Sequence, residues 1–269
     1  MSLVDALGQQ HVPVAPGAAV RIVSLVPSIT ELLCDLGLAP QLVGRTGFCI
    51  HPAPLVRDIP KVGGTKDVNI DKIRRLAPTH LIVNIDENEK PTVEQLAQFI
   101  PHVIVTHPLG PRDNLPLYRL LGGVFRAESE AAAWCARFEL AWDALQALPR
   151  PPARPARSVL YCIWKDPWMT VSPDTYIARM LAQIGWEQWV AAEAPGVRYP
   201  RFAWSDELVR GIDAVLLSSE PYRFTEEHAD ALERQIGKPV LLVDGEMLSW
   251  YGSRAVAGLD YLRRLAAEL

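Results

Sequence analysis

The sequence predicts an α/β fold made of two lobes that one long helix joins. Residues 127–148 have the pattern of a single unbroken helix, residues 21–126 alternate strand and helix patterns, and residues 157–269 repeat that alternation. Alternating strands and helices with short connections favour parallel sheets covered by helices. The pattern also leaves open a single domain in which residues 127–148 form a surface crossover helix.

The long helix is predicted by apolar residues that recur at the helical period, among them Ala131, Phe138 and Leu145, with charged residues between them. At about 1.5 Å per residue it would be about 33 Å long, close to the width of a small domain. Several prolines from Pro149 onward end it. We therefore divide the chain into an N-terminal extension (1–20), an N-terminal α/β lobe (21–126), the bridging helix (127–148), a proline-rich linker (149–156) and a C-terminal α/β lobe (157–269).

The N-terminal lobe is predicted to begin with a strand at residues 21–26 and a helix that starts at Ser28, where Ser28 and Glu31 have the spacing of a capping box. Asn69 is a candidate cap for a helix over 70–76. The other elements expected here are strands at 41–44, 80–84 and 102–106 and helices over 92–99 and within 111–125.

The loop after the second strand places an aromatic ring, a thiol and an imidazole close together, at Phe48, Cys49 and His51. One interpretation is a pocket wall in which His51 is a candidate metal ligand. The other is an ordinary surface loop with one buried ring.

The C-terminal lobe is predicted to contain strands at 157–164, 212–217 and 239–243, and helices over 174–184, 205–210 and 226–235, with a last helix reaching residue 267. Ser172 and Pro173 have the pattern of a helix start. Large or charged side chains gather where its strands and loops end: Trp164, Trp168, Arg198, Tyr199, Glu220, Tyr222, Glu246, Trp250, Tyr251 and Arg254. Aromatic rings with a few polar groups at strand ends favour a small-molecule pocket. The alternative is that about half of them only cover hydrophobic edges.

Composition excludes several functions. Hydrophobic residues make up 49% of the chain, charged residues 22%, and the net charge is −4, so neither nucleic acid nor an anionic membrane is an expected partner. No apolar run approaches the roughly 18 residues of a membrane-spanning helix. The first residues lack the basic start and apolar core of a signal peptide, which predicts a cytoplasmic protein or a mature segment without its leader. The four cysteines form no CxxC pair, and no nucleotide-binding or hydrolase motif occurs.

Three stretches and the long helix resemble a known family: RIVSLVPSITELLCDLG (21–37), VGGTKDVNIDKIRRLAPTHLIV (62–83) and WSDELVRGIDAVLL (204–217). They are similar to the cobalamin and iron-siderophore binding proteins of ABC importers, the helical-backbone (class III) periplasmic binding proteins. The resemblance implies two Rossmann-like lobes with parallel sheets, a ligand cleft between them and a periplasmic location. It also implies that Asp71 and Glu207 dock to arginines of a membrane permease. Phe48 and Tyr199 match cleft aromatics, His51 stands where an aromatic is more usual, and Thr65 stands where relatives carry tryptophan.

The function favoured by the sequence is that of a monomeric binding protein for a metal chelate, cobalamin-like or ferric siderophore-like, with no covalently bound cofactor. Phe48, Trp168, Tyr199 and Trp250 would stack on the ligand, Arg198 or Arg254 would pair with its anionic groups, and His51 would reach its metal.

Three alternatives stay open. One is a cytoplasmic small-molecule or metal-chelate binding protein on the same fold without a permease, in which Asp71 and Glu207 only begin helices. An enzyme, with Glu220, Glu246 and His51 as acid–base groups, is less favoured. A site for a bare metal ion would need His51, His107, Glu220 and Glu246 to converge.

Overall fold

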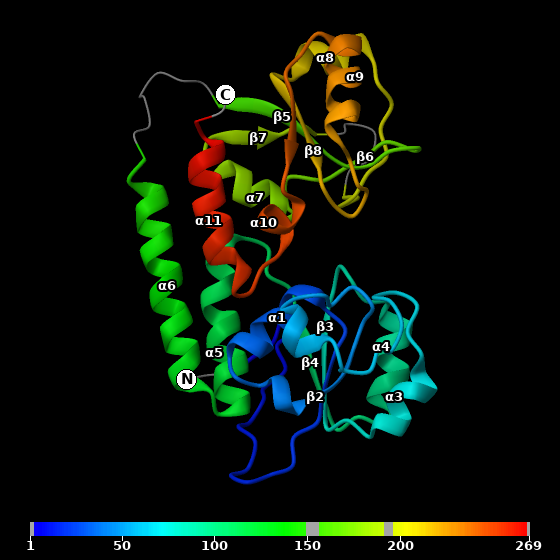
Figure 1. The fold of residues 1–269 in the computed structure, drawn as a ribbon, viewed down its shortest axis with the longest axis vertical. Coiled ribbons are helices and arrows are strands. Elements are labelled where there is room, and N and C mark those ends of the chain that lie inside the picture. The colour runs from blue at the N-terminus through cyan, green and yellow to red at the C-terminus, as the bar shows by residue number, and fades with distance from the viewer. Residues whose placement is uncertain (1–2, 149–155, 191–195, 268–269) are drawn as a thin grey trace. The chain divides into compact units, whose positions relative to one another are not determined.

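The computed structural model describes residues 3–148, 156–190 and 196–267 (Figure 1). The chain divides into two compact units. The first unit contains Met1–Pro108, Arg112–Phe138 and Tyr251–Arg254, and the second contains Leu109–Pro111, Glu139–Trp250 and Ala255–Leu269. The predicted proline-rich linker, except for Ala156, lies outside the described residues.

The first unit is built on a parallel sheet, as the sequence predicted. Its strands are β1 (Ile22–Ser24), β2 (Leu42–Arg45), β3 (His80–Asn84) and β4 (His102–Thr106), in the spatial order β2-β1-β3-β4. All three strand pairs are parallel. Buried side chains of β1 and β3 pack with those of helices α3 and α4 to form the core on one face of this sheet.

The helices between these strands are α1 (Pro27–Asp35), α2 (Ala53–Val56), α3 (Ile70–Leu76), α4 (Lys90–Ala97) and α5 (Asn114–Phe125), with short 3₁₀ turns at Ala39–Gln41 and Pro111–Asp113. The predicted cap of α3 is confirmed, because Asn69 Oδ1 accepts a hydrogen bond from the backbone N–H of Lys72 at 2.8 Å. The predicted capping box at Ser28 is wrong. Helix α1 begins at Pro27, and Val26 at the N-cap position makes no side-chain cap, since a proline suits the first helical position and starts the helix earlier.

Residues 3–14 of the predicted extension belong to the first unit and pack against its sheet. The backbone N–H of Ala6 donates to Val105 O at 2.9 Å, and the buried Asp5 carboxylate accepts from the N–H of Val105 at 3.1 Å. Asp5 also lies 3.1 Å from the imidazole of His11. This segment thus satisfies hydrogen-bonding groups of β4, an edge strand whose backbone would otherwise be open.

The predicted long helix is α6 (Glu128–Gln146), one residue shorter at its start and two at its end than expected. Its residues up to Phe138 belong to the first unit and those from Glu139 to the second. Phe138 and Leu145 are fully or nearly fully buried, as the periodicity predicted.

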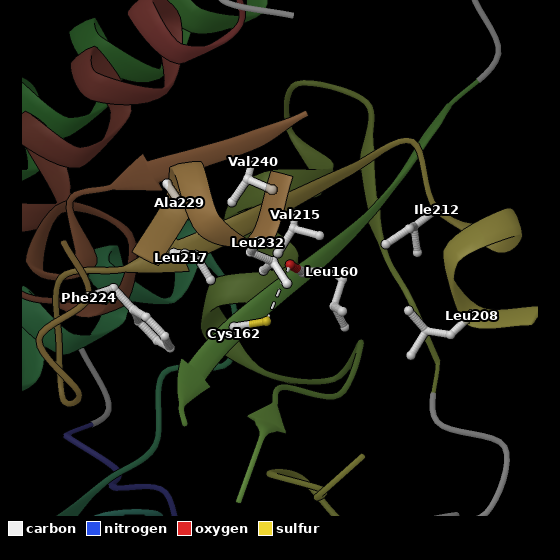
Figure 2. Close-up of a cluster of buried hydrophobic side chains, with 10 residues drawn as sticks. All are labelled: Leu160, Cys162, Leu208, Ile212, Val215, Leu217, Phe224, Ala229, Leu232 and Val240. Atoms are coloured by element: carbon white, nitrogen blue, oxygen red, sulfur yellow. Dashed lines mark hydrogen bonds between the residues drawn. The ribbon is translucent and has the colours of Figure 1, made fainter. Parts of the chain in front are cut away.

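The second unit also contains a mainly parallel sheet. Strands β5 (Arg157–Trp164), β8 (Ala214–Ser218) and β9 (Val240–Val243) are parallel neighbours. Two short strands that the sequence did not predict, β6 (Met169–Thr170) and β7 (Trp186–Gln188), both pair with β5, the first of them antiparallel. Figure 2 shows the core on one face of this sheet, where side chains of β5, β8 and β9 meet those of helices α8 and α9.

Helices of the second unit are α7 (Tyr176–Ala182), α8 (Asp206–Gly211), α9 (Glu226–Ile236), α10 (Gly245–Ser249) and α11 (Arg254–Leu265, whose first residue belongs to the first unit). The start predicted at Ser172 is wrong, because Thr175 caps α7 by accepting from the N–H of Ala178. Ser205 caps α8 by accepting from the N–H of Leu208 at 3.2 Å. Among the helices in the described part of the chain, none is long and apolar enough to cross a membrane.

Candidate functional site

The carboxyl ends of the strands in the first unit carry a group of predicted site residues. Ligands of open α/β sheets bind at this edge. Phe48 follows β2. Its side chain is 63% exposed, which makes it the most exposed of the predicted aromatic site residues. A Cβ atom on Gly64 would lie 3.4 Å from Phe48 Cε2, so the ring lies against the turn that contains Thr65.

That turn has a defined conformation. Gly63 has φ +113°, and the N–H of Gly64 donates to Asp67 O at 2.7 Å. Asn88, which follows β3, donates from Nδ2 to Thr65 O at 2.9 Å. The structure therefore places Phe48 against the turn that contains Thr65 and adds Asn88, which binds that turn and which the sequence did not indicate.

Two other residues of this loop differ in character. Cys49 is fully buried beside the hydroxyls of Thr30 and Thr46, and this burial raises the pKa of its thiol, so the thiol is part of the interior. His51 is half-buried. Across the described ranges, no group of three or more His, Cys, Asp or Glu side chains could hold a metal ion.

The predicted ligand residues Tyr251 and Arg254 belong to the first unit, where their polar groups bind its side chains. Tyr251 Oη donates to Glu87 Oε1 at 2.7 Å, and burial, followed by the charge of Glu87, raises the pKa of the phenol. Arg254 donates to both carboxylate oxygens of Glu31, at 2.8 and 2.6 Å. Both side chains therefore bind this segment to α1 and to the loop after β3 within the first unit.

The backbone of the same segment is held equally closely. The N–H of Gly252 donates to Asn114 Oδ1 at 2.6 Å, and Tyr118 Oη donates to Gly252 O at 2.8 Å. Gly252 has φ +82°, and a Cβ atom there would lie 3.1 Å from Ser28 O. We call residues 251–254 the clasp, because its side chains and backbone are bound to α1, α5 and the loop after β3.

The second unit presents a different set of aromatic residues. Trp164, at the end of β5, is 40% exposed and meets Tyr222 edge-on with ring centroids 5.5 Å apart. Trp168 is half-buried and stacks on Phe224 at 5.8 Å, with 13° between the rings. Trp168 is thus packed against the hydrophobic core of this unit, whereas Trp164 keeps much of its ring accessible.

Glu220 follows β8 and holds Trp250. Its Oε1 accepts from Trp250 Nε1 at 2.8 Å and from Ser249 Oγ at 2.9 Å. Burial raises the pKa of the Glu220 carboxyl, and the nearby carboxylates of Glu246 and Asp244 act in the same direction. With 8% of its surface exposed, Trp250 is mostly interior.

Arg198, predicted to pair with an anionic ligand, already has a carboxylate partner. Its Nη1 donates to Asp174 Oδ2 at 2.7 Å. A hydrogen bond from Ser172, followed by the charge of Arg198, lowers the pKa of Asp174. Tyr199 beside it is half-buried, as are Glu246 and Tyr222. The sequence signal for Asp174 was only its position after Ser172 and Pro173.

The two predicted docking carboxylates are exposed. Asp71 and Glu207 lie in the first turns of α3 and α8, one in each unit. Within the described residues neither carboxylate makes a hydrogen bond or ion pair, and other side chains, Asn69 and Ser205, cap the two helices. Helix capping therefore does not require either acid, although both favour the helix dipole.

Comparison with known proteins gives a consistent picture. The family model described as "Periplasmic binding protein" matches residues 22–235. A vitamin B12-binding protein of Pectobacterium carotovorum subsp. carotovorum (strain PC1) is 23% identical over 236 residues, which cover 87% of this chain and 83% of that protein.

Solved structures share the fold. The periplasmic vitamin B12-binding protein of Vibrio cholerae aligns with a TM-score of 0.76 at 17% identity, covering 93% of this chain and 98% of that one. A periplasmic heme-binding protein of Roseiflexus sp. RS-1, in its apo form, aligns with a TM-score of 0.74 at 22% identity, covering 93% of this chain and all of the other. At such identities the similarity supports the fold.

Proposed function

Because the chain belongs to the periplasmic binding protein family, we propose that it is the substrate-binding protein of an ABC importer for a metal chelate with a large apolar surface, of the cobalamin, heme or ferric siderophore type. The relatives named above bind vitamin B12 or heme. In this function no bond is made or broken, so we assign no catalytic residue.

The observation that carries this proposal is the exposure of aromatic rings at the strand ends of each unit. Phe48 in the first unit and Trp164 in the second keep 63% and 40% of their surface accessible, although large aromatic side chains are usually more buried. A macrocyclic or aromatic chelate would cover such rings, with apolar burial as the driving force. Of the predicted ligand residues, these two are therefore the ones that we assign to direct stacking.

The remaining predicted residues receive narrower roles in this proposal. In the first unit, Thr65 follows Gly64 in the turn against which Phe48 lies, and His51 is half-buried in the loop of Phe48. In the second unit, Tyr199 is half-buried beside Arg198. Arg198 donates to Asp174, so an anionic ligand group would have to bind the guanidinium alongside that carboxylate. We propose that Trp168 and Trp250 in the second unit, and the clasp in the first, support the exposed aromatic residues of their own unit rather than stack on the ligand.

The test is a titration of intrinsic fluorescence. The chain has eight tryptophans, so cyanocobalamin, hemin or a ferric siderophore should quench their emission in a saturable way. Phe48→Ala and Trp164→Ala should each weaken binding about tenfold, because each removes one stacking contact of roughly 1 to 1.5 kcal/mol. Leu140→Ala, at a position that is 74% exposed on α6, is the matched control. The proposal would be overturned if none of these chelates quenched the tryptophan emission in a saturable way.

We further propose that Asp71 and Glu207 contact basic groups of a membrane permease. Their exposure, and the absence of a partner for either within the described residues, support this role. Reversing both charges, Asp71→Lys with Glu207→Lys, should abolish stimulation of the permease's ATPase in proteoliposomes and leave ligand affinity unchanged. Full stimulation by the double variant would show that Asp71 and Glu207 do not contact the permease.

A further inference from the structure

The first unit contains a cavity of about 490 Å³ that no part of the proposed function uses. Two helices and the N-terminal segment form its walls. Arg119 and Gly123 come from α5, Glu128 and Ala132 from α6, and Leu3 and Pro13 from the segment that precedes the first strand. Its volume falls within the roughly 300 to 1,000 Å³ of small-molecule sites.

The spacing of these residues shows why a cavity forms here. Arg119 and Gly123 are four residues apart on α5, and Glu128 and Ala132 are four apart on α6, so each pair lies on one helix face. The wall residues near the helix contact are small. A Cβ atom on Gly123 would lie 2.5 Å from Leu3 Cδ2, so Leu3 packs directly on α5 at this glycine and forms one wall of the cavity.

Two exposed charged residues on the walls, Arg119 and Glu128, favour a ligand that carries both signs of charge. Arg119 and Glu128 have opposite charges, and within the described residues neither makes a hydrogen bond or an ion pair. Most other wall residues are apolar. An anionic group would bind the guanidinium and a cationic group the carboxylate, while an apolar body would fill the space between the helices.

We propose that this cavity binds a small zwitterion with an apolar body, of the class of hydrophobic amino acids and short hydrophobic peptides. A simple fatty acid fits less well, because Glu128 would repel its carboxylate. A bare metal ion fits less well still, since no metal-holding group of side chains occurs among the described residues.

The proposal is tested by isothermal titration calorimetry of the whole protein with leucyl-leucine, N-acetyl-leucyl-leucine and leucyl-leucinamide. Leucyl-leucine should bind with 1:1 stoichiometry. Blocking its ammonium or its carboxylate should weaken binding about tenfold or more, because each change removes one charge-assisted hydrogen bond. Arg119→Ala and Glu128→Ala should weaken leucyl-leucine binding to a similar extent, whereas Glu130→Ala, an exposed acid outside the cavity, should not.

Ala132→Trp provides a steric test that leaves both charges in place. The indole should fill the cavity and abolish binding, while Ala133→Trp, at an exposed neighbour outside the cavity, should bind as the parent does. Circular dichroism reports whether each variant is folded. The affinity for a chelate, measured by fluorescence quenching, should be unchanged in both variants. Three results would each overturn the proposal: no heat of binding at millimolar peptide, equal affinity for the blocked peptides, or unchanged binding in folded Ala132→Trp.

Discussion

Acidification should destabilise the protein through His80, a buried histidine at the start of β3. Its ring stacks on His102 with centroids 4.7 Å apart and meets Phe125 edge-on at 5.1 Å. Burial lowers the pKa of His80 to about 4, and the neighbouring His102 and His11 act in the same direction. Thr79 Oγ1 lies 2.8 Å from its Nδ1. The folded state therefore favours the neutral ring.

The sign of the effect follows from this pKa. In the unfolded chain the pKa of His80 returns to about 6.5, so between pH 6.5 and 4 the unfolded state binds more protons than the folded state. The stabilisation is complete above pH 6.5 and is lost as the pH falls toward 4. The full shift corresponds to about 3 kcal/mol, which we reduce to about 2 kcal/mol because solvent screens part of the interaction.

The assay is urea unfolding at several pH values for the parent protein and for His80→Phe, which keeps a ring but cannot take up a proton. Burial also raises the pKa of Asp35 and of Glu220, so these carboxyl groups contribute to the pH dependence of stability as well. The informative quantity is therefore the difference between the two proteins. The free energy of unfolding of the parent should fall by about 2 kcal/mol relative to His80→Phe between pH 7 and pH 4. Parallel pH profiles for the two proteins would refute the reasoning.

Two further predictions concern the clasp. Gly252→Ala should destabilise the protein by about 2 to 4 kcal/mol in thermal or urea unfolding, because it combines a positive φ with a Cβ atom 3.1 Å from a backbone oxygen. Gly17→Ala, which has φ +74° but open space around it, should cost only about 1 kcal/mol, and equal costs would contradict this explanation. A double-mutant cycle on Arg254→Ala and Glu31→Ala should give a coupling free energy of about 1 to 2 kcal/mol, since the pair is bidentate and largely shielded from solvent. A coupling near zero would show that the two side chains do not hold the clasp.

The contacts of the clasp could not be predicted from the sequence. Tyr251 and Arg254 attracted attention as large polar side chains after the last strand, which is a reasonable sign of a ligand site. Their partners Glu87 and Glu31 lie 164 and 223 residues earlier in the chain. No local pattern reports pairs at such separations, so the engagement of these side chains could not be anticipated.

Local periodicity was enough to predict the α/β class, the parallel pairing of strands in the first sheet and the extent of α6 to within two residues. These features depend on the burial of one face of each strand or helix, which leaves a repeat in the sequence itself. Short strands such as β6 and β7 escaped prediction because two or three residues carry no measurable period.

The exposure of each candidate side chain depended on contacts that local patterns do not encode. Phe48 and Trp164 remain exposed, whereas Trp250 is buried beside Glu220 and Trp168 is half-buried against Phe224. In the sequence all four are aromatic residues at predicted strand ends or in the loops that follow them. The difference arises from which distant residues pack beside each ring, because burial belongs to the folded arrangement of many segments and not to any one of them.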